Sequence, residues 1–319
     1  MSPASGGIPL PSFLIIGAER CATRWLRSNL DLHPEIYAPP VDLAWFSDVA
    51  AMRARGGRWY QSQFDAWDGE PVLGESSGSY LMLRHRPAEV AARIHQRLPD
   101  VRLVALIRQP VDRLESAVRQ QVKRGKLPAD VDVYDLVCRN DPAVTELDLI
   151  GAGLYATCLY PYVRQFGEKL LVIEHTDVCE RPEAVYDQVL RHIGADPDFV
   201  PEGLDQVRFS DRSTVTMVRE LADEQRRVIY SAFRGDVEEL EALLGRDLPH
   251  WDPGPPSIGR VDEVDAVLRA IPASGPEPEA GDVLPADQEL DPAEGAEGAE
   301  GDQGPTDVVA TDVGTGATA

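Results

Sequence analysis

Short apolar runs recur along the first 250 residues of the chain, separated by longer stretches in which apolar and polar residues mix. The clearest runs are at 13–17, 72–75, 101–107 and 170–174. A strand that is covered on both faces is apolar along most of its length, as in parallel sheets flanked by helices. We therefore predict buried, mostly parallel strands at these four ranges.

The segments between these runs carry apolar residues three and four positions apart, which is the spacing of one helix face. This spacing predicts helices at about 23–32, 87–98, 182–193 and 220–244, a helix that begins at Pro110, and a short helix within 261–271. Pro110 suits a first helical position, where the missing N–H costs nothing. Strands that alternate with helices predict an α/β fold of three layers around a mostly parallel central sheet.

The end of the chain has a different composition. Residues 272–319 include twelve Asp and Glu but no Lys, Arg, His or aromatic residue. Such a segment buries too little apolar surface to offset its ordering entropy, so we predict a disordered acidic tail rich in Pro, Gly and Ala. The expected organisation is a flexible N-terminus at 1–10, one domain at 11–252, a linker at 253–271 and the tail at 272–319.

Charge and composition exclude several classes of protein. The formal net charge of −23 becomes −11 without the twelve tail acids, so a nucleic-acid partner is disfavoured. No apolar run approaches about 18 residues and the start lacks a basic, apolar leader, so we expect neither a membrane partner nor a signal peptide. The four cysteines lack ligand spacing, so we expect no metal. Without a signal peptide, we expect reduced thiols in the cytoplasm. The oligomeric state is left open.

The turn after the first predicted strand is a candidate anion site. A strand that passes directly into a helix leaves unpaired amides at the helix N-terminus, where phosphate groups bind. In this turn Cys21 and Ala22 are small, Thr23 offers a hydroxyl, and Arg20 and Arg24 add charge. A Walker A motif would need Gly-Lys-Ser/Thr where the chain has Ala-Thr-Arg, which weakens a nucleotide kinase. An ordinary turn without ligand is the alternative interpretation.

A second candidate follows the strand predicted at 101–107. Arg108 stands at the carboxyl end of this strand, where open α/β sheets bind ligands, and Ser116 lies eight residues further on. A guanidinium and a hydroxyl together bind a phosphate monoester well. The alternative is a structural arginine that pairs with an acid such as Asp112.

These two turns carry a resemblance to a known family. Residues 13–40, FLIIGAERCATRWLRSNLDLHPEIYAPP, resemble the 5′-phosphosulfate loop of sulfotransferases that use 3′-phosphoadenosine 5′-phosphosulfate (PAPS), above all the heparan-sulfate branch and its bacterial relatives. The second turn resembles the family's 3′-phosphate motif L-R-x-P-x-x-R-x-x-S at Arg108, Pro110, Arg113 and Ser116. Looser likenesses occur at 59–64, 74–80, 153–162 and 244–246, so the resemblance covers about residues 11–252.

The resemblance implies a P-loop-like sulfotransferase fold in a bacterial cytoplasmic enzyme. It also implies PAPS as the donor, bound by residues 20–24 with Arg108 and Ser116, and no metal. The acceptor would be a hydroxyl, or less readily an amine, of a small molecule or a carbohydrate. The identity of that acceptor is left open.

The resemblance also assigns catalytic roles. Arg20 stands where the family has a lysine that stabilises the departing phosphate. Asp42 occupies the position of a loop glutamate that serves as the base in the family, and its side chain is one methylene shorter than that glutamate. Glu75 is the next candidate for the base, and Ser76 beside it replaces a second lysine.

Members of the family also bind the 3′-phosphate through a basic loop near the end of the domain. Arg208, Arg212 and Arg219 are candidates for that role in this chain, although no spacing distinguishes them.

Two other functions stay open. A P-loop kinase-like phosphotransferase would need Mg²⁺ ligands and a Walker lysine, and neither is evident. A catalytically weak nucleotide-binding member of the family would fit the missing lysines at positions 20 and 76. However, the chain has three lysines and 28 arginines, so arginine at position 20 is weak evidence for inactivity.

Overall fold

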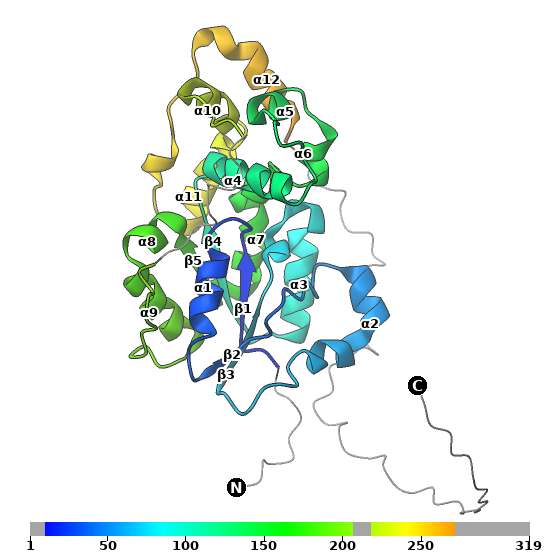
Figure 1. Ribbon diagram of the computed structural model, residues 1–319, viewed down its shortest axis with the longest axis vertical. Coiled ribbons are helices and arrows are strands. Elements are labelled where there is room, and N and C mark those ends of the chain that lie inside the picture. The colour runs from blue at the N-terminus through cyan, green and yellow to red at the C-terminus, as the bar shows by residue number, and fades with distance from the viewer. Residues whose placement is uncertain (1–9, 207–217, 272–319) are drawn as a thin grey trace, which may run out of the picture. The chain divides into compact units, whose positions relative to one another are not determined.

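The computed structural model describes residues 10–206 and 218–271, and the predicted tail at 272–319 lies outside this range. The described chain has an α/β fold built on a five-stranded sheet in which every pair of neighbouring strands is parallel (Figure 1). The strands are β1 (Phe13–Gly17), β2 (Ile36–Tyr37), β3 (Val72–Ser76), β4 (Arg102–Ile107) and β5 (Leu170–Glu174).

The helices surround this sheet and extend beyond one end of it. They are α1 (Thr23–Leu30), α2 (Val49–Ser62), α3 (Pro87–Arg97), α4 (Pro110–Lys123), α5 (Val133–Cys138), α6 (Pro142–Glu146), α7 (Tyr155–Phe166), α8 (His175–Glu180), α9 (Pro182–Ile193), α10 (Asp223–Tyr230), α11 (Arg234–Leu244) and α12 (Val261–Arg269). A short 3₁₀ helix, η1 (Gly78–Leu81), follows β3.

The strand order β2-β3-β1-β4-β5 places the first strand at the centre of the sheet. Helices α1, α8 and α9 lie on one side of the sheet, and α3 and α7 lie on the other (Figure 1). This is the predicted three-layer arrangement. Because β1 is paired with both β3 and β4, the turns that follow these three strands meet at one edge, where open α/β sheets bind ligands.

The central strands are fully buried, as their apolar runs predict. Every residue of β1 is buried, and in β4 only the first residue is exposed. Helix α4 begins at Pro110, which confirms the expected helix start. The strand that the pattern does not predict is β2, whose two residues are too few to show a period.

The helix predicted at 220–244 is two helices, α10 and α11, separated at 231–233. The physical reason is that burial is almost continuous across the break. Val228, Ile229, Tyr230, Ala232 and Phe233 are all at most 4% exposed. A single straight helix presents only one apolar stripe to the core, so it could not bury all five side chains.

Helix α12 lies within the range predicted for a short helix, and it packs against α5 and α10. Val267 is fully buried in this contact, and the Tyr134 hydroxyl of α5 donates a hydrogen bond to Glu263 of α12. Helices α4, α5, α10 and α12 gather beyond the carboxyl ends of the strands (Figure 1). They flank the edge at which the predicted site lies.

Candidate active site

The turn between β1 and α1 has a tightly folded backbone. The Ala18 amide donates to the Leu106 carbonyl of β4 at 2.8 Å, which fixes the turn to the neighbouring strand. Gly17 has a φ of +128°, and a Cβ at this position would lie 3.2 Å from the Gly78 carbonyl oxygen. Glycine is therefore required where the chain leaves β1. Arg20 and Ala22 also have positive φ values, 73° and 71°.

Helix α1 begins at this turn without a side-chain cap. Ala22 is its N-cap residue and offers no side-chain acceptor to the first amides of the helix. These amides have no carbonyl within the helix to bind, and the helix dipole adds positive potential at the same place. The start of α1, with Thr23 and the exposed Arg24, is thus suited to an anion.

Arg20 joins the two predicted turns. Its Nε donates to the Ser116 hydroxyl of α4 at 3.1 Å, and its Nη1 lies 3.4 Å from the Gln120 amide oxygen. Burial lowers the pKa of Arg20, and the nearby charges of Arg24 and Arg108 lower it further, whereas Glu19 acts in the opposite direction. Three cations therefore share this corner of the sheet, and a bound anion would relieve their repulsion.

A second link between the turns passes through Tyr155 at the start of α7. The Arg108 amide donates to the Tyr155 hydroxyl at 3.3 Å, and this hydroxyl lies 3.5 Å from the Cys21 sulfur. Tyr155 is buried and its ring lies 5.9 Å from that of Trp251. The two motifs are thus held together by Ser116 and Gln120 of α4 and by Tyr155 of α7.

Cys21 is fully buried, and burial raises the pKa of its thiol. Its amide donates to the Ala18 carbonyl at 3.3 Å, so both its side chain and its backbone N–H have partners inside the protein. A direct contact between Cys21 and a cofactor therefore has the least geometric support among the predicted residues. Its small side chain instead lets the turn pack close to Tyr155.

The arginine of the second motif that follows Arg108 has a structural position. Arg113 is 1% exposed and donates a hydrogen bond to the Leu149 carbonyl. It anchors α4 to the loop before α7, and its charge also acts on Cys21 in the first turn. Ser116, one helical turn later, is the residue of this motif that contacts Arg20.

Asp42 lies in the exposed loop between β2 and α2. Its Oδ1 accepts a hydrogen bond from the Ala44 amide at 3.1 Å, which closes a short turn. In the described part of the chain, no hydrogen bond or ion pair connects Asp42 to the two anion turns. Burial raises the pKa of Glu75, and the charge of Asp42 adds to this effect.

The remaining predicted basic residues do not enter this geometry. Arg208 and Arg212 lie outside the described residues, and Arg219 is exposed on the segment before α10. By contrast, His175 lies close enough to Arg108 to be influenced by its charge. Burial lowers the pKa of His175 to about 4, and Arg108 adds to this effect, so its imidazole is neutral at pH 7.

Two contacts of the site were missed by sequence reasoning. Gln120 lies one turn after Ser116 on the same face of α4, and this spacing could have identified it. Tyr155 lies within the looser family likeness at 153–162, but nothing in its local sequence indicates that it contacts both turns.

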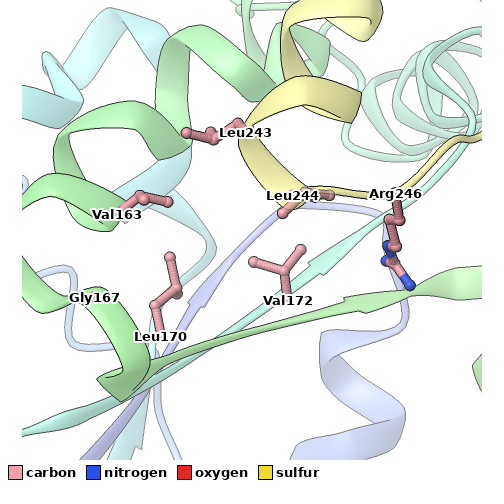
Figure 2. A pocket seen from close by; sticks show the side chains of 7 residues that line it. All are labelled: Val163, Gly167, Leu170, Val172, Leu243, Leu244 and Arg246. Atoms are coloured by element: carbon pink, nitrogen blue, oxygen red, sulfur yellow. The ribbon is translucent and has the colours of Figure 1, made fainter.

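A pocket of about 350 Å³ lies elsewhere, between α7, β5 and α11 (Figure 2). Its aliphatic side chains belong to Val163, Leu170, Val172, Leu243 and Leu244, and Arg246 lies at one end (Figure 2). It shares no residue with the two anion turns.

Within residues 10–206 and 218–271, no group of three or more His, Cys, Asp or Glu side chains is arranged to hold a metal ion. The helices in these ranges are all too short or too polar to cross a bilayer.

Known proteins with similar sequences and structures are sulfotransferases. The chain is 30% identical over 175 residues to human heparan sulfate glucosamine 3-O-sulfotransferase 6, covering 51% of this chain and 48% of that protein. It is 23% identical over 275 residues to mouse bifunctional heparan sulfate N-deacetylase/N-sulfotransferase 4, covering 76% of this chain and 31% of that protein. The chain spans about half the length of the first of these relatives, and no family model matches it.

The crystal structure of a sulfotransferase from Alicyclobacillus acidocaldarius superposes with a TM-score of 0.65 at 27% sequence identity. The match covers 76% of this chain and 99% of that structure. Together with the sequence relatives, this likeness supports the sulfotransferase family for this chain.

Proposed function

We propose that this protein transfers a sulfuryl group from PAPS to a hydroxyl group of a carbohydrate or a smaller molecule. The observation that carries the proposal is the contact between Arg20 and Ser116, which joins the two predicted anion turns. The nucleotide of PAPS has phosphate groups at two positions, so it needs two anion sites at a fixed separation. The heparan sulfate relatives support a carbohydrate acceptor.

The donor set at the turns fits this nucleotide. The uncapped start of α1, Thr23 and Arg24 would bind the 5′-phosphosulfate end. Arg108 and Ser116 would bind the 3′-phosphate, since a guanidinium and a hydroxyl match the oxygens of a phosphate monoester. PAPS supplies an activated sulfuryl group whose departure leaves negative charge on a phosphate.

The residues of the chain then have separate tasks. Arg20 neutralises the charge that develops on the departing phosphate, and its permanent charge requires no proton transfer. The Asp42 carboxylate takes the proton of the acceptor hydroxyl as the new O–S bond forms. Ser116 and Gln120 hold the Arg20 guanidinium in place.

The sulfotransferase relatives favour this reaction over phosphoryl transfer. A nucleotide-binding member with little activity is the second candidate, and the geometry of Asp42 favours it, because no described contact connects this carboxylate to the anion turns. A turnover measurement separates the two, since both bind the nucleotide.

The first experiment measures thermal stabilisation by 3′-phosphoadenosine 5′-phosphate, ATP and AMP. At about 100 times its dissociation constant, a ligand of the native state adds about 2.7 kcal/mol to the free energy of unfolding. We expect the bisphosphate to raise the melting temperature well above either control nucleotide, because only it fills both turns. Equal shifts of the melting temperature with ATP, or no shift with any nucleotide, would refute the assignment of PAPS as the donor.

The second experiment tests turnover with labelled PAPS and a panel of phenols, sugars and sulfated or carboxylated glycans. Transfer of label to a hydroxyl acceptor supports the proposed sulfotransferase activity. Tight bisphosphate binding without transfer to any acceptor or to water supports the weakly active alternative.

A further inference from the structure

A buried carboxyl group lies beside the loop that carries Asp42. Glu75, near the end of β3, is 1% exposed, and its Oε1 accepts hydrogen bonds from the hydroxyls of Tyr60 at 3.1 Å and Tyr80 at 2.9 Å. Its Oε2 has no hydrogen-bond partner among the described residues. Neither of the two anion turns uses this group.

The hydrogen bonds continue from Glu75 to the loop through only one of the two tyrosines. The Phe46 amide donates to the Tyr80 hydroxyl at 3.4 Å, and the Phe46 carbonyl accepts from Nε of the buried Arg93 at 2.8 Å. Both backbone polar groups of Phe46 are therefore held by side chains from other elements. Phe46 lies four residues after Asp42, so these bonds fix the end of the segment 42–46.

The two tyrosines otherwise resemble each other closely. Each donates to the same oxygen of Glu75, and each ring meets the Phe46 ring edge-on. The ring centroids lie 5.7 Å apart for Tyr60 and 5.8 Å apart for Tyr80, with an interplanar angle of 69° in both cases. The Tyr60 ring also stacks on Trp45 at 5.3 Å, but only the Tyr80 hydroxyl accepts a hydrogen bond from the Phe46 amide.

The chemistry of Glu75 suits a neutral acid. Burial raises its pKa to about 8, against the opposing effect of the two tyrosine hydrogen bonds, and the charge of Asp42 raises it further. A neutral carboxyl keeps its carbonyl oxygen as an acceptor for both phenols and leaves its hydroxyl on the other oxygen. It also avoids placing a second negative charge near Asp42.

We propose that Glu75 is a positioning residue for the predicted base: through the Tyr80 hydroxyl it holds the segment 42–46, and with it Asp42. This inference rests on the proposed function in that Asp42 acts as the base. Glu75 itself exchanges no proton with the acceptor in this role. Its task is to keep the Tyr80 hydroxyl oriented so that the oxygen accepts the Phe46 amide.

The test begins with amide hydrogen exchange at Phe46 in the full-length protein, which requires no turnover. Tyr80→Phe should speed exchange of this amide at least tenfold, because the amide loses its acceptor. Tyr60→Phe, the matched control, removes the other phenol from Glu75 and should change this rate less than twofold. An unchanged rate in Tyr80→Phe, or an equal rise in Tyr60→Phe, would overturn the proposal.

Turnover and nucleotide affinity are then measured in the same variants. We expect Tyr80→Phe to lower kcat at least tenfold while the dissociation constant for 3′-phosphoadenosine 5′-phosphate changes less than twofold. Glu75→Ala should behave like Tyr80→Phe, and Glu75→Gln, which retains a carbonyl acceptor, should restore most of the loss. If Glu75→Ala does not fold, Tyr80→Phe and Glu75→Gln decide the question.

One result would replace the proposal with a direct role in catalysis. If Glu75→Gln exchanges normally at Phe46 but loses as much kcat as Tyr80→Phe, Glu75 takes part in proton transfer. A wild-type protein that transfers no sulfuryl group would reject the proposed function, whereas the exchange rates at Phe46 would still decide whether Glu75 holds the segment.

Discussion

Arg20 and Asp42 differ in how firmly the structure holds them. The guanidinium of Arg20 contacts two side chains of α4 and lies partly buried among other cations. Asp42 is exposed and is held only by its local turn and by the chain that follows it. Substitutions at the two positions should therefore affect turnover and nucleotide affinity differently.

Arg20→Ala removes charge from the proposed cofactor site, so we expect turnover to fall by about 10² or more and nucleotide affinity to fall as well. Asp42→Asn preserves shape, so affinity should stay within twofold while turnover falls by about 10²–10⁴. A nitrophenol acceptor, which loses its proton more easily, should recover part of the second loss. Calorimetry and initial rates measure these effects, with Arg191→Ala on α9 as a surface control. Wild-type turnover in Asp42→Asn would mean that another group is the base.

Glu75 gives stability a specific pH dependence. Its pKa is about 8 in the folded protein and near 4.5 when unfolded, so the folded state binds one more proton between these values. The stabilisation that Glu75 contributes to the folded state is fully present below about pH 4.5 and is lost as pH rises through about 8. The free energy of unfolding should thus fall by up to about 1.4 kcal/mol per pH unit in this window.

Glu75→Gln should remove this slope and make the protein more stable than the wild type at pH 8. Denaturant unfolding between pH 5 and 9 measures the difference between the two proteins. Parallel stability curves for the wild type and the variant across this range would show that Glu75 does not titrate as described.

At the scale of elements, α2 is unusual in a strongly acidic chain. It contains three arginines, Arg53, Arg55 and Arg58, and no acidic residue. All three are exposed, and none forms an ion pair with a described residue, although Arg55 lies 4.3 Å from the Trp59 ring centroid. By contrast, Arg93 of α3, Arg119 of α4 and Arg191 of α9 each pair with an acid four positions away. The segment 42–46 leads directly into α2, so this helix adds positive potential near the predicted base.

We therefore expect an anionic acceptor to have a lower KM than a neutral one. Replacing the three arginines of α2 with serine should raise KM for an anionic glycan about tenfold and leave KM for a neutral phenol unchanged. The effect should shrink as salt rises from 0.05 to about 0.5 M, where exposed charges are screened. Arg139→Ser, at the residue that follows α5, is the control. Equal losses with both acceptors would point to damage in the helix rather than to recognition.

Elements also show why part of the fold follows from the sequence and part does not. The runs at β1 and β4 are buried on both faces, so their composition alone identifies them. The break between α10 and α11 depends on how much apolar surface one helix can bury, which the spacing of apolar residues does not show. The two residues of β2 become a strand only because β3 lies beside them.

The candidate site follows the same division. Arg20, Arg108 and Ser116 come from turns whose sequence marks the ends of buried strands, and the pairing of β1 with β4 brings those turns together. Tyr155 and Tyr80 connect positions 47 and 34 residues away from their own. Such contacts depend on the packing of α7 and η1 against the sheet, which the local sequence around these tyrosines does not predict.

At the scale of the whole molecule, the charge is distributed unevenly along the sequence. Twelve of the 54 acidic residues lie within residues 272–319, where no basic or aromatic residue occurs. Deletion of this segment should change the melting temperature by no more than about 2 °C. Nucleotide affinity and kcat on a small neutral acceptor should stay within about twofold of the full chain. The reason is that the segment offers neither core-forming side chains nor phosphate ligands. Calorimetry and rate measurements on the truncated protein test this. A tenfold loss of transfer, or loss of cooperative unfolding, would show that the segment is structural.

The placement of the four cysteines has a consequence for chemical labelling. Cys21 and Cys158 are buried, Cys138 is partly covered, and Cys179 on α8 is exposed. The unsubstituted chain thus presents one readily accessible thiol to a maleimide dye. Cys179 lies within the electrostatic influence of Arg108, at the end of β4. A fluorophore attached there would sense charge arriving at the second anion turn. Binding of the proposed cofactor could therefore be followed by fluorescence in the natural sequence, while the thiol inside the first turn stays unmodified.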